Sequence, residues 1–202
     1  MSIPSWMRGN KYESAYPLFM TLKAVEMVAE LMALSARTAP KGRGRDSIVI
    51  KVVAERELEE LSKELRRLGE ARGIKFFLRD AGNLENSEAC VLIGSKASET
   101  VGLDCGGCGF TSCKEMLAAQ KPFLDKEPDK PFHGPNCVIK MADLGLALGS
   151  AAKTASLHNV DNRVMFTAGV AALSLNWLEG CRVAYGLPLK ASGKSIYFDR
   201  PA

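Results

Sequence analysis

Histidine is scarce in this sequence, with 2 residues among 202, and aromatic residues make up only 7%. His133 and His158 form no pattern with a serine nucleophile or with paired carboxylates, so hydrolytic chemistry has little support. The net charge is +4, from 27 basic and 23 acidic side chains. Mild basicity and few aromatics argue against a nucleic-acid groove, which usually carries a basic stripe with aromatic residues.

Long apolar runs are also absent. No stretch approaches the roughly 20 apolar residues that a membrane-spanning helix requires. Residues 1–15 hold no apolar segment followed by a small-residue cleavage site, as a secretory signal would. We therefore expect a cytoplasmic protein with no membrane partner. Because thiols stay reduced in that compartment, neighbouring cysteines favour a metal site or catalysis over disulfide bonds.

The apolar residues that are present follow both helical and strand patterns. Val25, Val28 and Met32 recur at spacings of three and four, which predicts a helix over 18–36. The other expected elements are helices over 55–72, 114–120, 140–157 and 168–178 and strands over 47–54, 74–80, 89–95, 181–189 and 194–200. This mixture predicts one α+β domain over residues 1–202, with 102–137 as an inserted segment.

Two of the expected helices, 18–36 and 140–157, are apolar on more than one face. Helices of that kind are too apolar for an exposed surface. We therefore expect them to pack together and across a two-fold interface, in a homodimer or a higher homo-oligomer.

The inserted segment carries the pattern Cys105-x2-Cys108-x4-Cys113, followed at a distance by Cys137. Thiolates are ligands for both zinc and iron–sulfur clusters. Glycines between the first cysteines let the backbone fold tightly around a cluster. Zinc sites usually show two short cysteine pairs, whereas Cys137 stands alone. The pattern favours an iron–sulfur cluster and leaves a zinc-stabilised binding module as the alternative.

The fourth ligand has several candidates. Cys137 follows a Gly-Pro turn and precedes an expected helix, which favours it. Cys90 and Cys181 lie in apolar strands, where a core cysteine is the better interpretation. His133 is a lone histidine in a loop, and such residues are more often solvated. The expected metal ligands are therefore Cys105, Cys108, Cys113 and Cys137.

The motif "CGGCGFTSC" with a distant fourth cysteine resembles the single [4Fe-4S] domain of the B subunit of membrane electron-transport complexes and of corrinoid iron–sulfur proteins. The gap before Cys137 is longer and richer in proline here. The flanking segments extend the likeness over nearly the whole chain: "SARTAPKGRGRDSIVIKVV", "MADLGLALGSAAKTASLHNVDNRVMFTAGVAA" and "YGLPLKASGKSIYFDR" resemble the uncharacterised ferredoxin-domain proteins of anaerobic bacteria and archaea. The resemblance implies a [4Fe-4S] cluster and electron transfer to a redox partner protein that the sequence does not name.

The frame of that family is similar to the nitroreductase fold, an α+β flavoprotein dimer, so the resemblance implies a nitroreductase-like α/β sandwich with an inserted cluster loop. In the nitroreductase fold a helix ending in an Arg-x-Ala-Pro-like stretch leads into the first strand beside the flavin, and Arg37, Ala39 and Pro40 stand in a similar place.

This likeness makes Arg37, Lys41, Arg43 and Arg45 the candidates for binding FMN, since fixed cations suit phosphates. Basic loops are more often simply solvated. The polar Asn-Ser-Gln-type continuation of the nitroreductase loop is missing here, and no Arg-Arg-Ser phosphate segment is evident at the N-terminus. A flavin-dependent reductase, with the cluster feeding electrons to FMN, stays as the second hypothesis.

Overall fold

The structure is a computed structural model that describes residues 18–96, 98–123 and 130–198, with side chains from residue 21 onward. The elements in chain order are α1 (Leu18–Thr38), η2 (Gly42–Gly44), β1 (Ile48–Ala54), α2 (Glu55–Arg72), α3 (Lys75–Glu85), β2 (Ala89–Lys96), α4 (Cys113–Gln120), η3 (Lys121–Phe123), α5 (Val138–Leu157), β3 (Asp161–Asn162), α6 (Phe166–Ser174) and β4 (Cys181–Lys190).

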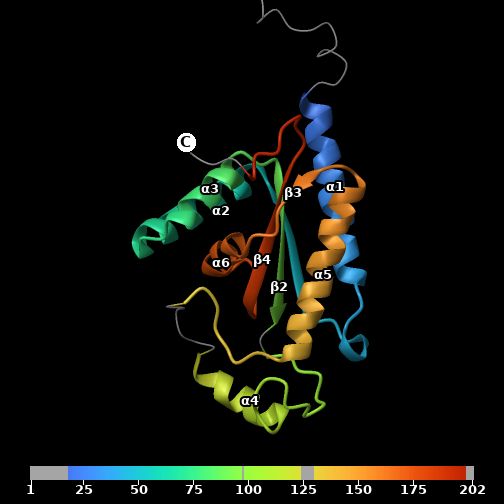
Figure 1. Cartoon of the computed structure of the whole chain (residues 1–202), viewed down its shortest axis with the longest axis vertical. Coiled ribbons are helices and arrows are strands. Elements are labelled where there is room, and N and C mark those ends of the chain that lie inside the picture. The colour runs from blue at the N-terminus through green and yellow to red at the C-terminus, as the bar shows by residue number, and fades with distance from the viewer. Residues whose placement is uncertain (1–17, 97, 124–129, 199–202) are drawn as a thin grey trace, which may run out of the picture.

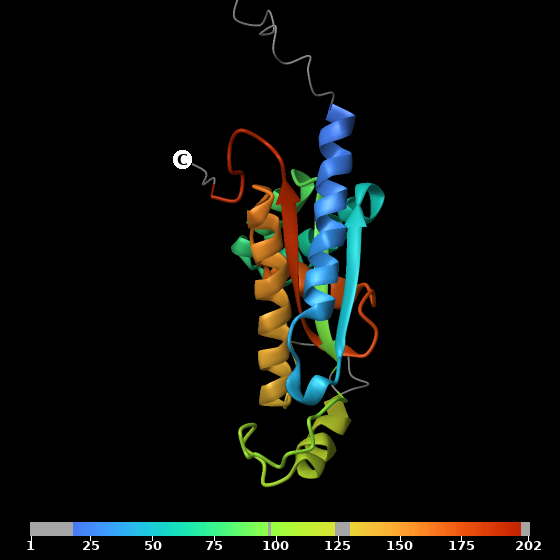
Figure 2. The ribbon, with the colours of Figure 1, turned by 90° about the vertical axis from the view of Figure 1, so that its right-hand side faces the viewer.

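The strands form one antiparallel sheet in the order β1-β2-β4-β3. Helices α1 and α5 cover one face, and α2, α3 and α6 cover the other (Figure 1). Figure 2 shows α1 and α5 side by side along the sheet, and the Thr154 hydroxyl donates to Ser35 Oγ between them at 2.7 Å. The expected α+β sandwich is confirmed.

The central strand β2 explains why both faces need helices. Its residues from Ala89 to Ser95 are all buried. Because side chains alternate along a strand, Val91 and Ile93 join the core under α1 and α5, while Cys90 and Leu92 join the core under α2, α3 and α6. A strand buried on both faces therefore reads as a continuous apolar run.

The expected strand over 74–80 is wrong, because this segment begins α3. Phe77, Ala81 and Leu84 are buried at the spacing of a helix, not of a strand. Gly73 takes a left-handed φ of 64° and ends α2, so the chain turns back and starts a second helix against the first. The β-branched and aromatic residues of the segment, Ile74, Phe76 and Phe77, favour a strand when the sequence is considered alone.

The expected strand over 194–200 is also wrong where the structure describes it, since residues 194–198 form no strand. Residues 199 and 200 lie outside the described part. Side-chain contacts, not strand-to-strand hydrogen bonds, fix this segment. The buried Tyr197 shares a 3.0 Å hydrogen bond with Ser87 Oγ, and its carbonyl accepts from Arg163 Nη1 at 3.0 Å.

Residues 98–123, with the cysteine-rich turn and α4, lie beyond one end of the sheet (Figure 1). Phe132 already packs in the sandwich, on Phe166 of α6 and Tyr185 of β4, before α5 begins. The status of 102–137 as an insertion in one domain stays a prediction. Among the described helices, none is long and apolar enough to cross a membrane.

Candidate metal centre

Two helix N-termini carry two of the predicted ligands. Cys113 is the first residue of α4, and Cys137 is the N-cap residue of α5. Ser112 caps α4 by accepting a hydrogen bond from the Glu115 amide at 3.2 Å. Because a helix N-terminus bears partial positive charge, both ends suit an anionic metal–thiolate group.

The turn that carries Cys105 and Cys108 depends on glycine. Gly106 and Gly109 have φ angles of +71° and +85°, which residues with a Cβ rarely adopt. A Cβ on Gly107 would lie 2.6 Å from Val138 Cγ1, so the turn packs directly on the first residue of α5. This contact brings the turn beside Cys137, although the two segments are far apart in sequence.

Asp104 closes the other side of the turn. Its carboxylate accepts a hydrogen bond from the Cys113 amide at 2.7 Å, and its own φ is +46°. The bond ties the residue before the first cysteine to the first residue of α4. Sequence reasoning missed this role; the available signal was an aspartate in a glycine-rich turn, where Asp commonly bonds nearby backbone amides.

A small apolar core supports the cysteines from within. Its buried members are Val101, Met116 and Cys137, and the half-buried residues packed on them are Cys108, Phe110, Leu117 and Ile139. Cys108 and Cys137 therefore share one apolar environment, while Cys105 is exposed and Cys113 is half-buried.

The four predicted ligands thus come from three segments that meet at one end of the molecule. In the described part of the chain, no three His, Cys, Asp or Glu side chains form a group that could hold a metal ion. The ligand assignment stays a prediction. The residues nevertheless fit a thiolate-bound group in their chemistry: four thiols, two helix N-termini, a turn of glycines without Cβ atoms, and apolar shielding.

The other two cysteines lie in the core between the sheet and α6. A Cβ on Gly186 would lie 3.0 Å from Cys90 Sγ, and one on Gly94 would lie 2.9 Å from Cys181 Sγ. Burial raises the pKa of the Cys90 thiol, and it raises the pKa of the Cys181 thiol to about 12. Both thiols are therefore neutral at physiological pH and poor nucleophiles.

This difference predicts the order of alkylation. With bound metal removed by a chelator under reducing conditions, iodoacetamide at pH 8 should label the exposed Cys105 first and leave Cys90 and Cys181 unlabelled until denaturant is added. Peptide mass spectrometry measures the order. Labelling of Cys181 as fast as Cys105 in the native protein would contradict the burial described here.

The basic loop after α1 divides into two kinds of cation. Arg37 pairs with Asp46 and donates to the Ile48 carbonyl at 2.7 Å. Lys41 Nζ donates to three carbonyls at the end of α1, those of Ala36, Arg37 and Ala39, at 2.7–3.1 Å. These two cations serve the fold itself.

Arg43 and Arg45 are exposed, as is Arg37 at the end of α1. Arg43 Nη1 donates to the Val101 carbonyl at 3.4 Å, just before the cysteine turn. The loop therefore lies beside the cysteine segment. Whether any of the four candidates binds an FMN phosphate stays a prediction.

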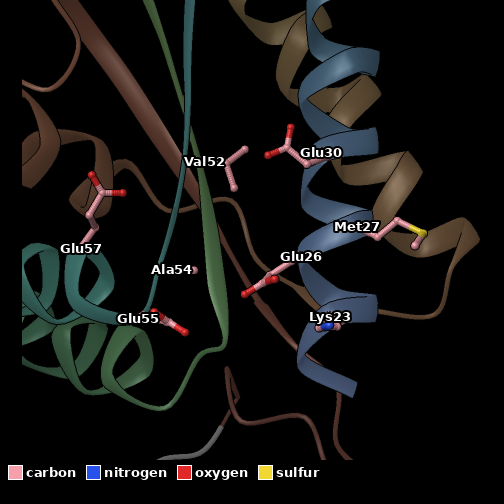
Figure 3. Close-up of a pocket in the computed structure, with 8 residues that line it drawn as sticks. All are labelled: Lys23, Glu26, Met27, Glu30, Val52, Ala54, Glu55 and Glu57. Carbon is pink, nitrogen blue, oxygen red and sulfur yellow. The ribbon is translucent and has the colours of Figure 1, made fainter. Parts of the chain in front are cut away.

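A hollow of about 670 Å³ lies elsewhere, between α1 and the edge strand β1 (Figure 3). Four glutamates line it: Glu26, Glu30, Glu55 and Glu57. Carboxylates repel a phosphate group, so the negative charge of this groove disfavours binding of an FMN phosphate.

Two sequence comparisons bear on the chain as a whole. The profile of a family described as "uncharacterized protein containing a ferredoxin domain" matches residues 133–200, which include Cys137 but not the cysteine turn. An archaeal relative from Archaeoglobus fulgidus, described as an uncharacterized protein, is 43% identical over 178 residues; the alignment spans 88% of this chain and 92% of the relative.

Solved structures show the same fold at low identity. The nitroreductase CinD from Lactococcus lactis, in complex with nicotinic acid, aligns with a TM-score of 0.54 at 11% identity, over 86% of this chain and 84% of that chain. A nitroreductase-like family protein from Bacillus cereus gives 0.52 at 9%, over 94% and 93%. A nitroreductase from Desulfitobacterium hafniense with bound FMN gives 0.50 at 14%, over 88% and 83%. The fold is that of the nitroreductases.

Proposed function

The chain belongs to the family of uncharacterized proteins containing a ferredoxin domain, and from that membership we propose that it transfers electrons through a [4Fe-4S] cluster held by Cys105, Cys108, Cys113 and Cys137. The observation that supports the proposal is the close approach of the glycine turn that carries Cys105 and Cys108 to the first residue of α5, with Cys113 and Cys137 at the N-termini of α4 and α5. When bound, such a cluster accepts and releases one electron.

The surrounding residues have separate tasks in this proposal. Phe110, Met116 and Leu117 limit the access of water from the protein side. The exposed side, at Cys105, gives a short path to a redox partner protein in the cytoplasm. Asp104 fixes the spacing between the turn and α4 through its bond to the Cys113 amide.

Anaerobic purification followed by an absorption spectrum and metal analysis tests this function. We expect a broad absorption band at about 400 nm together with iron and acid-labile sulfide. A colourless protein that contains zinc would support the zinc-stabilised binding module instead.

A flavin-dependent reductase is the second candidate. It is favoured by the fold shared with nitroreductases, one of which is described with bound FMN, and by the exposed pair Arg43 and Arg45. The same spectrum would then show sharp flavin bands, and Arg43→Ala would weaken FMN retention. A protein that contains no flavin and takes up none on reconstitution would remove this candidate.

We also propose a homodimer or higher homo-oligomer through the outer faces of α1 and α5. Apolar side chains stay exposed on these faces, with Met27 at 66%, Leu34 at 59% and Leu146 at 49% exposure. Light scattering at micromolar concentration should report at least a dimer, and Leu34→Glu should shift it toward the monomer. A monomeric wild-type protein would count decisively against this assembly.

A further inference from the structure

A buried ion pair joins the basic loop to α5. Lys140 and Asp143 are 1% and 2% exposed, with Nζ and Oδ2 3.2 Å apart. Buried charges need further hydrogen bonds to offset their desolvation, and here these bonds go to the loop. Lys140 Nζ donates to the Arg45 carbonyl at 2.6 Å, and Asp143 Oδ1 accepts from the Gly42 amide at 2.8 Å.

The same turn of α5 also supports the cysteine site. A Cβ on Gly42 would lie 2.8 Å from Ile139 Cγ2 and 3.2 Å from Val101 Cγ2, so the loop backbone touches both side chains. Val101 and Ile139 belong to the small apolar core that contains Cys137. The loop and the cysteine segment therefore both pack against the first turn of α5, although no sequence pattern connects them.

We propose that Arg43 is a fixed cation of the cysteine site, and that Lys140 and Asp143 are the positioning residues that hold it there. Arg43 reaches the Val101 carbonyl at the entrance of the cysteine segment. A cation held near a metal–thiolate group favours its more negative, reduced state and so raises the reduction potential. The effect on the potential rests on the proposed [4Fe-4S] function.

Potentiometry on the purified cluster-containing protein tests the role of the charge. Arg43→Gln should lower the reduction potential. Arg56→Gln should leave it unchanged, because Arg56 lies in the first turn of α2, next to the end of β1 opposite the loop that carries Arg43. Gly42→Ala keeps every charge but forces the loop away from Ile139, so it should shift the potential in the same direction. Gly42→Ala should produce little further shift in the reduction potential when Arg43→Gln is already present. An unchanged potential in Arg43→Gln would overturn the proposal.

Hydrogen exchange tests the positioning pair without depending on the cluster. In Asp143→Asn we expect amide exchange at least about tenfold faster over residues 42–46 and 101–113. Asp80→Asn is the matched control, since Asp80 is also buried and accepts a 2.8 Å bond from Thr167, but between α3 and α6. It should leave both segments protected.

The two failures can be told apart. If the protein contains no iron but Asp143→Asn speeds amide exchange in both segments, the proposed function is wrong and the role of the positioning pair stands. The role of Lys140 and Asp143 is wrong, whatever the iron content, if Asp143→Asn leaves amide exchange in the two segments unchanged. It is also wrong if Asp80→Asn speeds that exchange equally. If Asp143→Asn does not fold, Gly42→Ala replaces it, with Gly145→Ala as its control, because a Cβ on Gly145 of α5 meets nothing within 4 Å.

Discussion

Serine in place of Cys105, Cys108, Cys113 or Cys137 is expected to lower the iron content of the purified protein sharply. Loss of one thiolate leaves an iron open to solvent, so the cluster becomes labile and iron is lost. Iron and sulfide analysis per polypeptide, after anaerobic purification, measures the loss.

Cys90→Ser and Cys181→Ser are the matched controls. Both thiols are buried in the core against the sheet, so serine there should cost about 1–3 kcal/mol of unfolding free energy while the iron content stays full. Among the four ligand variants, Cys137→Ser should also destabilise the protein, because Cys137 is only 7% exposed in the small apolar core. Full iron in Cys137→Ser, with loss in Cys90→Ser or Cys181→Ser, would overturn the ligand assignment.

The part of the site that could be predicted from sequence is the local part. Cysteine spacing and glycines report on a turn of a few residues, and the separation of core cysteines from candidate ligands follows from the apolar strands around Cys90 and Cys181. In the structure, Cys105 and Cys108 lie in the glycine turn, and Cys113 begins α4 after it. Their convergence on one metal remains a prediction.

The rest of the site depends on contacts between distant segments. Lys140 and Asp143 appear in the sequence as two charges in an apolar helix, and nothing near them shows that their partners are the Gly42 amide and the Arg45 carbonyl. Lys41 was a candidate for phosphate binding, yet its ammonium group caps α1. Long-range backbone partners of this kind leave no local pattern.

The lack of a local pattern for long-range contacts also explains the wrong element predictions. The strands predicted over 47–54, 89–95 and 181–189 correspond to β1, β2 and β4, whose apolar side chains pack in the two cores. The segment 74–80 was misread because its aromatic residues suit both a strand and a buried helix face. The packing of α3 on α2 decides in favour of the helix. A short sequence pattern does not report on that packing.

A second large effect is expected at Gly169, where α6 meets the backbone of β4. A Cβ on Gly169 would lie 1.9 Å from the Ala184 carbonyl oxygen and 2.1 Å from its carbon. Backbone in the middle of a sheet cannot give way as a flexible side chain can. We therefore expect Gly169→Ala to lower the free energy of unfolding by about 4 kcal/mol or more, which is exceptional for one methyl group.

Urea or thermal unfolding of Gly169→Ala beside Gly82→Ala measures this effect. Gly82 lies in α3, and a Cβ there meets nothing within 4 Å. Alanine at 82 should therefore raise stability by about 0.5–1 kcal/mol, because it removes conformational freedom from the unfolded chain. The opposite signs separate the helix propensity of alanine from the clash at β4. Equal stability of the two variants would show that a Cβ at position 169 does not clash with the Ala184 carbonyl, and so that α6 packs less closely on β4 than in this structure.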